Sequence, residues 1–154
     1  MKVLLQRVSK ASVSVGGRII GSIQRGLVAL VGAANGDTES DVRYLALKTI
    51  NLRIFEDDSG KFNLSILDIK GDLLIVSQFT LLANSIKGRR PSFTDAAPPD
   101  LAESLIEKYI TAVQAYGINT ATGRFREHML VEIHNDGPVT IMLDSREKFP
   151  LPVI

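Results

Sequence analysis

The chain has 154 residues, of which 45% are hydrophobic and 23% are charged, and its formal net charge is +1. These values are typical of one globular domain, placed here over residues 1–154, and so small a charge argues against a general polyanion-binding protein. No apolar run is long enough to span a bilayer, Arg7 interrupts the N-terminal apolar stretch before a secretory signal can form, and cysteine is absent. We therefore expect a cytoplasmic protein without membrane attachment, disulfides or a thiolate nucleophile.

The first third of the sequence predicts strands. Apolar residues alternate imperfectly from Val3 to Val15, Gly16-Gly17 predicts a hairpin, and two more strands are expected over 18–23 and 27–31. Since residues 27–31 are all apolar, this strand is expected in the centre of a sheet.

Two helices are predicted farther along the chain. Thr38 can cap the first, with Asp41 at the capping-box position and apolar residues at helical spacing up to Ile50. The second begins near Asp100 and stops at Gly117.

The remaining segments predict further strands. Residues 73–82 read as the most strongly buried strand, and residues 83–99 as a long loop. A closing hairpin is expected from strands over 129–133 and 139–143 around a turn at Asn135-Asp136-Gly137. Because strands outnumber helices, we predict an α+β fold: a mostly antiparallel sheet or open barrel with two main helices packed on it.

The usual catalytic side chains are few. His128 and His134 are the only histidines, and their spacing of six places them on one face of a strand, where we interpret them as exposed residues beside a turn. A metal site would need more ligands than these two and scattered carboxylates. No phosphate-binding loop, dinucleotide fingerprint or nucleophile elbow is present, and we expect no metal and no cofactor.

Two segments depart from local patterns. Ser77-Gln78-Phe79-Thr80 places three polar side chains at the end of an apolar strand, which fits either a strand leaving the core or a strand end that lines a ligand pocket. In Asn135-Asp136-Gly137-Pro138, Asp-Gly alone predicts a tight turn, but Pro138 cannot donate a hydrogen bond to a sheet. A Gly-Pro peptide can be cis, and with no Cβ on Gly137 it can present carbonyl oxygens that capture an amine and refuse a bulkier substituent.

Together these segments resemble the paired signatures of the D-aminoacyl-tRNA deacylase family. The likeness covers nearly the whole chain, through Gln6-Arg7-Val8, Gly26-Leu27, Arg53-Ile54-Phe55, Gly60-Lys61-Phe62-Asn63-Leu64, Ser77-Gln78-Phe79-Thr80-Leu81, Arg90-Pro91-Ser92-Phe93, Thr122-Gly123-Arg124-Phe125 and Asn135-Asp136-Gly137-Pro138-Val139-Thr140. The chain departs from the family at Phe62, where Met is expected, and in a C-terminal extension, residues 145–154. Neither departure is expected to touch the signature segments.

The resemblance implies the activity and the assembly. Members hydrolyse the ester that joins a D-amino acid to the 3′ end of tRNA, and they also remove mischarged glycine. They are homodimers with cross-subunit active sites, in which the cis Gly137-Pro138 peptide would enter the partner's pocket and exclude L-aminoacyl groups with main-chain atoms.

The resemblance also assigns roles to residues. Ser77, Gln78, Phe79 and Thr80 are the expected catalytic segment, with Gln78 bonding the ribose or the ester. Arg7 would brace the Gly-Pro segment, Phe125 and Met129 would sandwich the terminal adenine, and Lys87, Arg89 and Arg90 would meet acceptor-stem phosphates. Core packing is the alternative for Phe125 and Met129, and a solvated loop is the alternative for the basic cluster.

Because no histidine or carboxylate adjoins Thr80 in sequence, our hypothesis is hydrolysis assisted by the 2′-hydroxyl of the terminal ribose. Main-chain amides near Phe79 and Thr80 would stabilise the oxyanion. Two other interpretations stay open: a non-catalytic module that binds tRNA or a small ligand, and a small-molecule amidohydrolase with Thr80 as nucleophile.

Overall fold

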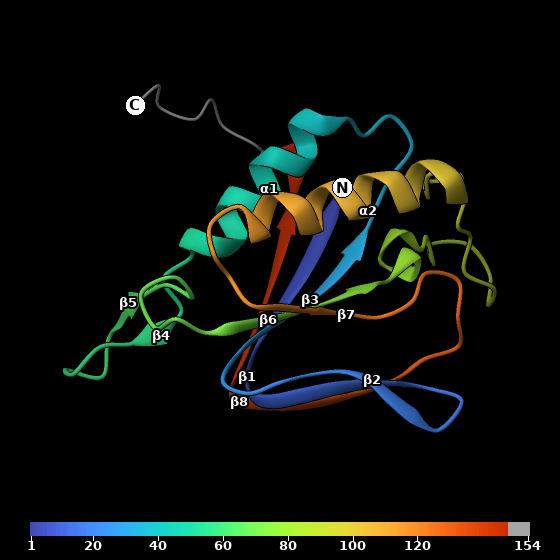
Figure 1. Ribbon diagram of the computed structural model, residues 1–154. Helices are drawn as coiled ribbons and strands as arrows, with labels where there is room; N and C mark the ends of the chain where they lie inside the picture. Colours follow the sequence, from blue (N-terminus) through green and yellow to red (C-terminus); the bar gives the residue numbers. More distant parts are fainter. Residues whose placement is uncertain (148–154) are drawn as a thin grey trace.

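The computed structural model describes residues 1–147 (Figure 1). Its main sheet contains β1 (Lys2–Val15), β2 (Arg18–Ile23), β3 (Gly26–Gly32), β6 (Asp72–Ser77), β7 (Thr120–Thr122) and β8 (Leu130–Asp144). A small separate hairpin is formed by β4 (Phe55–Glu56) and β5 (Phe62–Leu64). The helices are α1 (Glu39–Asn51), α2 (Pro99–Gln114) and the short 3-10 helices η1 (Phe79–Leu82) and η2 (Ser145–Glu147). No helix among these residues is long and apolar enough to cross a membrane.

The main sheet is mixed, so the prediction of a mostly antiparallel sheet is not confirmed. Its strand order is β2-β1-β3-β6-β7. β3 pairs with the first half of the long strand β1 and β2 with its second half, both along one edge, and β8 pairs along the opposite edge of β1. β1 runs antiparallel to β2, β3 and β8, whereas the β3–β6 and β6–β7 pairs are parallel. The reason is the position of the helices: α1 lies in the connection from β3 to β6 and α2 in that from β6 to β7, and such crossovers return the chain in its original direction.

The two predicted helices cover one side of the sheet, which curves until its ends nearly meet (Figure 1). β2, at one end of the sheet, lies close to β7 at the other end. At Gly21 of β2 the two are so close that an added Cβ would lie 3.1 Å from the Thr122 carbonyl oxygen. Thr49 of α1 and Tyr109 of α2 share a buried hydrogen bond of 2.7 Å that joins the helices. The prediction of two helices on a nearly closed sheet is confirmed.

Two hydrophobic cores explain the apolar pattern of the strands. One lies between the sheet and the helices and includes Leu27, Ala29, Leu73 and Ile75. The other lies inside the curved sheet and consists of Val8, Ala11, Val13, Ile23, Val28, Leu74 and Val76. Because β3 and β6 lie between the cores, both faces of each strand are buried and the sequence is continuously apolar. β1 passes from the first core to the second, and this accounts for its imperfect alternation.

Several local signals are confirmed. The Thr38–Asp41 capping box opens α1, and β3 is central in the sheet. Asp57 organises the β4–β5 turn by accepting hydrogen bonds from the Asn63 side chain at 2.7 Å and from the amides of Ser59 and Lys61. These bonds, that from Asn63 foremost, hold the pKa of the Asp57 carboxyl below its usual range.

The predicted strand over residues 73–82 is wrong beyond Ser77. β6 ends at Ser77, and η1 begins at Phe79. Between them, the Gln78 amide donates to the Val31 carbonyl of β3 at 2.8 Å. The turn is then closed by the Leu81 amide, which donates to the Gln78 carbonyl at 3.1 Å. The polar residues of this segment therefore mark the point where the chain leaves the sheet.

The predicted C-terminal hairpin is also wrong, because both halves belong to the one strand β8. Asn135 pairs with Val8 and Thr140 with Gln6, so residues 136–139 face Arg7 alone. The segment is an enlarged bulge, in which extra residues on one strand oppose a single residue of its neighbour. The Asn135 side chain closes it by accepting from the Val139 amide at 3.1 Å and donating to the Thr140 hydroxyl at 2.9 Å.

Candidate active site

A cavity of about 560 Å³ opens beside the end of β6. Its floor and walls are mostly apolar and come from β3, the end of β6, the start of α2 and the loop before β8. Of the predicted site residues, it brings together Ser77, Gln78, Phe79, Phe125 and Met129. An apolar cavity with a few polar groups on one wall is the usual form of a small-ligand site.

The polar wall is formed where β6 becomes η1. Phe79 and Thr80 are the first residues of η1, and leading amides of such a turn have no acceptor within it. The Gln78 side-chain amide donates to the Thr80 hydroxyl. An amide cannot accept the hydroxyl proton as a base, so this contact does not activate Thr80 as a nucleophile.

Phe79 is more than half exposed, and Phe93 of the following loop supports its ring. The ring centroids lie 5.1 Å apart at an interplanar angle of 66°, an edge-to-face contact. This contact joins the loop over residues 83–98 to the wall of the cavity.

Residues 125–129, in the loop before β8, also line the cavity. Phe125 and Met129 are only partly buried, and both line the cavity while also packing against the cores. Their position is compatible with both interpretations made from the sequence, since core packing does not remove them from the cavity surface.

The Gly137–Pro138 peptide is cis and belongs to the exposed bulge of β8. Arg7 is buried beneath it and donates from Nε to the Asp136 carbonyl at 2.9 Å and from Nη1 to the Ile54 carbonyl at 3.0 Å. Glu56 adds a carboxylate 3.8 Å from Nη2. Arg7 therefore connects the bulge to the β4–β5 hairpin.

Phe62 packs against this arginine, with the Arg7 Cζ atom 5.3 Å from the centre of its ring. Cation–π contacts of this length are attractive. Phe62 therefore contacts the side chain that holds the bulge, although Arg7 itself lies in neither signature segment. Of the C-terminal extension, Ser145–Glu147 form η2, and residues 148–154 lie outside the described part of the chain.

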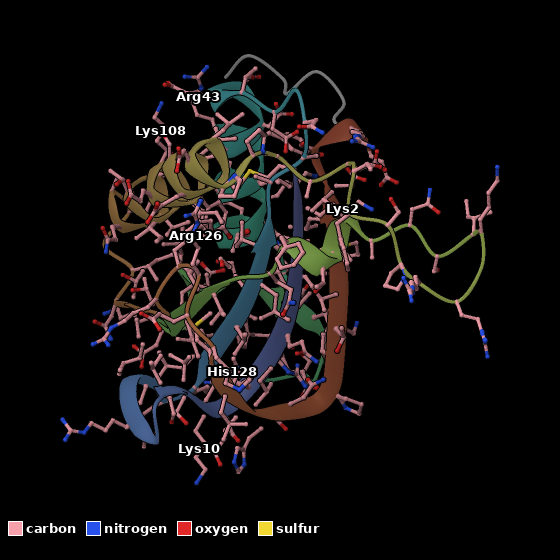
Figure 2. All side chains as sticks on the ribbon, turned by 90° about the vertical axis from the view of Figure 1, so that its right-hand side faces the viewer. Lys2, Lys10, Arg43, Lys108, Arg126 and His128 are labelled. Carbon is pink, nitrogen blue, oxygen red and sulfur yellow. The ribbon has the colours of Figure 1, made fainter. Side chains whose placement is uncertain are left out.

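Within one chain the two signature segments do not line a common cavity. Arg7 and Asp136 line a separate small hollow of about 60 Å³, and neither Gly137 nor Pro138 lines the large cavity. Lys87, Arg89 and Arg90 also lie outside it, in an exposed loop that extends away from the body of the molecule (Figure 2).

Among the lining residues that sequence reasoning did not assign to a site are Arg126 and His128, the two that can carry a positive charge. His128 lies in the loop before β8 and not on a strand, whereas His134 lies on β8. Both histidines are exposed, as interpreted from the sequence. No group of three metal-ligating side chains occurs among residues 1–147.

Comparison with known proteins gives consistent results. A family model described as D-Tyr-tRNA(Tyr) deacylase matches residues 4–144. A D-aminoacyl-tRNA deacylase from Fervidobacterium nodosum is 54% identical over 149 residues, which cover 97% of this chain and 100% of that protein.

Two solved structures share the fold. A c-Myc DNA unwinding element binding protein is 40% identical with a TM-score of 0.88, and the match covers 94% of this chain and 98% of that one. A protein titled a probable eukaryotic D-amino acid tRNA deacylase is 18% identical with a TM-score of 0.77, over 92% of this chain and 97% of that one. The matches in sequence and structure extend over nearly the entire length, and the chain belongs to the D-Tyr-tRNA(Tyr) deacylase family.

Proposed function

We propose that this protein hydrolyses the ester bond between a D-amino acid and the 3′ end of tRNA, releasing both, and that it also removes mischarged glycine. The observation that carries the proposal is the cavity, which combines a mostly apolar lining with main-chain amides and polar side chains at the end of β6. Membership of the family, and the name of the 54% identical relative, support the same reaction. Such a protein acts where translation occurs, in the cytoplasm.

In this proposal the terminal adenosine occupies the cavity. Phe125 and Met129 hold the adenine, because aromatic and thioether side chains pack well on the face of a base. The ribose and the ester then lie against Ser77, Gln78 and Phe79. Gln78 is suited to bond the ribose or the ester carbonyl, since its amide both donates and accepts.

For the chemical step, the 2′-hydroxyl of the terminal ribose helps a water molecule to attack the ester carbonyl. The Phe79 and Thr80 amides stabilise the negative charge that develops on the carbonyl oxygen. Collapse of the tetrahedral intermediate breaks the bond to the ribose 3′ oxygen, which leaves with a proton. The Thr80 side chain does not line the cavity and is not a nucleophile in this mechanism, and its contact with the Gln78 amide supports that assignment.

Discrimination against L-aminoacyl groups is assigned to Gly137 and Pro138 of a second copy. A cross-subunit site is supported because neither residue contributes to the lining of the cavity in its own chain. In the exposed bulge their carbonyl groups are suited to bind the α-ammonium of the substrate, and the main chain beside them leaves no room for an L side chain. Arg7 holds the bulge in place through the Asp136 carbonyl.

β8 provides a surface for the second copy. Within residues 1–147 it pairs only with β1, so its other edge has no strand beside it. Leu130 and Met142 on this strand are 64% and 47% exposed. Long edge strands with exposed apolar side chains favour association with another chain.

The test is a matched pair of substrates, D-tyrosyl-tRNA and L-tyrosyl-tRNA, incubated with catalytic amounts of the protein without added metal. We expect turnover of the D form alone, and glycyl-tRNA should also be deacylated. Equal hydrolysis of the D and L forms would contradict the assignment, as would binding without turnover.

The mechanism is tested separately. Thr80→Ala should keep D-tyrosyl-tRNA hydrolysis within about tenfold of the wild-type rate, whereas a tRNA ending in 2′-deoxyadenosine should be cleaved at least about a hundredfold more slowly. Loss of activity in a folded Thr80→Ala variant would favour Thr80 as a nucleophile. Cleavage of free D-amino acid esters as fast as the tRNA-linked ester would favour an amidohydrolase of small molecules.

A second candidate is a non-catalytic nucleic-acid-binding module. It is favoured by the name of the 40% identical protein, which describes binding to a DNA unwinding element. The D- and L-tyrosyl-tRNA assay separates the two candidates, because a binding module retains tRNA without releasing the amino acid.

A further inference from the structure

Arg126 adopts a backbone conformation that is unfavourable for its side chain. Its φ is +66°, and within residues 1–147 Lys70 is the only other residue besides glycine with a positive φ. A Cβ atom makes this left-handed region costly, so glycine is the stable choice there. An unfavourable residue that is kept on the wall of a cavity points to a role for its side chain.

The charge of the cavity singles out the same residue. Among its lining residues, within the described part of the chain, Arg126 and His128 alone can carry positive charge, and Glu127 is the single acid. Figure 2 shows Arg126 beside α2 and His128 lower on the same face, toward Lys10. The cavity is otherwise apolar apart from the Ser77–Gln78 wall, so an anionic group of a ligand would be bound at this loop.

The Arg126 guanidinium remains accessible to such a group. Its Nη2 atom lies 3.6 Å from Asp100 Oδ1, but the two side chains are 62% and 99% exposed. Solvent screening makes an ion pair of this kind weak, and a guanidinium has five N–H donors, of which this contact engages few.

We propose that Arg126 binds the phosphodiester group on the 5′ side of the terminal adenosine. This inference rests on the proposed function, because it requires the adenine to lie between Phe125 and Met129. Arg126 directly follows Phe125 in the lining of the cavity, and its side chain is 62% exposed, so its guanidinium is accessible to a phosphate next to an adenine bound there. Guanidinium groups bind phosphate oxygens through paired charge-assisted hydrogen bonds.

The test compares two probes, adenosine and adenosine 5′-(methyl phosphate), which differ by one monoanionic phosphodiester. Dissociation constants measured by calorimetry need no turnover. The wild-type protein should bind the phosphodiester at least about tenfold more tightly than adenosine, the gain expected of charge-assisted hydrogen bonds. Inorganic phosphate should bind at least about tenfold more weakly than the phosphodiester nucleotide, because it lacks the base.

The matched variants are Arg126→Gly and Lys70→Gly. Both remove an exposed positive charge and both relieve a positive φ, but Lys70 lies in the turn before β6 and does not line the cavity. Both variants should fold and show a Tm about 2–4 °C above that of the wild-type protein. Arg126→Gly should lose the preference for the phosphodiester, whereas Lys70→Gly should keep it.

Two results would overturn the inference: equal wild-type affinity for adenosine and its methyl phosphate, or a preference that survives in Arg126→Gly. Inorganic phosphate binding as tightly as the nucleotide would also do so, by indicating a site for a free anion. The proposed function fails in a different way, by absence of D-specific hydrolysis of tyrosyl-tRNA, and that assay does not depend on the two probes.

Discussion

At Gly137 the lack of a side chain is a structural requirement. Its φ is +131°, and a Cβ there would lie 2.9 Å from Val139 Cγ2 and 3.0 Å from Arg7 Nη2. An added methyl group must displace the arginine that holds the bulge or shift the main chain of the bulge itself. The residue thus couples the shape of the signature segment to the position of Arg7.

We expect Gly137→Ala to lower kcat/KM for D-tyrosyl-tRNA by at least about tenfold and to reduce the free energy of unfolding by about 1–2 kcal/mol. Deacylation kinetics and urea unfolding measure the two effects. Gly17→Ala is the control, because Gly17 in the β1–β2 turn also has a positive φ, of +78°, but a Cβ added there would meet no atom within 4 Å. An equal loss of activity in both variants would contradict a specific role for Gly137.

At the scale of elements, the contact between α1 and α2 depends on one buried polar pair. Tyr109 is fully buried, and its hydroxyl shares the 2.7 Å hydrogen bond with Thr49, whose own hydroxyl donates to the Leu45 carbonyl at 2.8 Å. Burial raises the pKa of Tyr109 well above its usual range. The native fold therefore keeps this hydroxyl protonated.

This pair predicts a pH dependence. Since the folded pKa is raised, the stabilisation is complete below the unfolded pKa of about 10 and is lost as the pH rises above it. Tyr109→Phe should lower the free energy of unfolding by about 1 kcal/mol at neutral pH. Above pH 10 the wild-type protein should lose stability relative to Tyr109→Phe, by up to about 1.4 kcal/mol per pH unit. Urea unfolding between pH 7 and pH 11 measures this difference, and a constant difference would contradict the argument.

The loop over residues 83–98 is an element held at its base and exposed at its tip. Asn84 and Ser92 exchange two main-chain hydrogen bonds of 2.8 Å, and Phe93 packs on Phe79. Lys87, Arg89 and Arg90 lie between these anchors, all exposed. Changing the three residues to Gln should therefore leave the fold and the cavity intact.

If this loop meets acceptor-stem phosphates, the triple variant should bind tRNA more weakly and with a shallower salt dependence. The slope of log Kd against log salt concentration should fall by about 2–3 for three lost phosphate contacts. Binding measured from 50 to 300 mM KCl gives the slope, and Arg43→Gln on α1 is the control. An unchanged slope would identify the cluster as a solvated loop.

At the scale of the whole molecule, the separation of the two signature segments leads to a complementation experiment. Gln78→Ala alters the cavity wall and Gly137→Ala alters the bulge, so if the protein forms the proposed homodimer, each variant alone would lack one part of both sites. Equal co-expression makes half of the dimers mixed, and one of the two cross-subunit sites in each mixed dimer has wild-type residues. Activity should return to about a quarter of the wild-type value.

The control for the co-expressed mixture is an equal mixture of the two separately purified variants, assayed before their subunits can exchange. A dimer by light scattering, together with restored activity, would support the cross-subunit site. Activity no higher than the mean of the two separate variants would contradict it. That result would mean that both segments act in the active site of their own chain.

Local signals in the sequence were sufficient for much of the fold. The Thr38–Asp41 capping box, the helical spacing before Gly117 and the Asp57–Gly60 turn depend on contacts within a few residues, and the structure contains all three elements. The continuous apolar run of β3 indicated its central position, since burial on both faces removes the alternation. Of the predicted segment Ser77–Thr80, the first three residues line one cavity with Phe125 and Met129, whereas Thr80 does not.

Other features depend on partners far away in the chain. Asp-Gly within β8 has the composition of a hairpin turn, but β1 pairs with the residues on both sides of it and turns the segment into a bulge over Arg7. Likewise, the direction of β6 and β7 follows from the crossovers through α1 and α2, and the left-handed Arg126 has no signature in its neighbours. Short-range patterns were thus enough to predict most of the elements, to single out both signature segments and to indicate the likeness to the family. Strand direction, the form of the Gly-Pro segment and the charged rim of the cavity became visible only in the folded chain, because they depend on long-range pairing that short patterns do not encode.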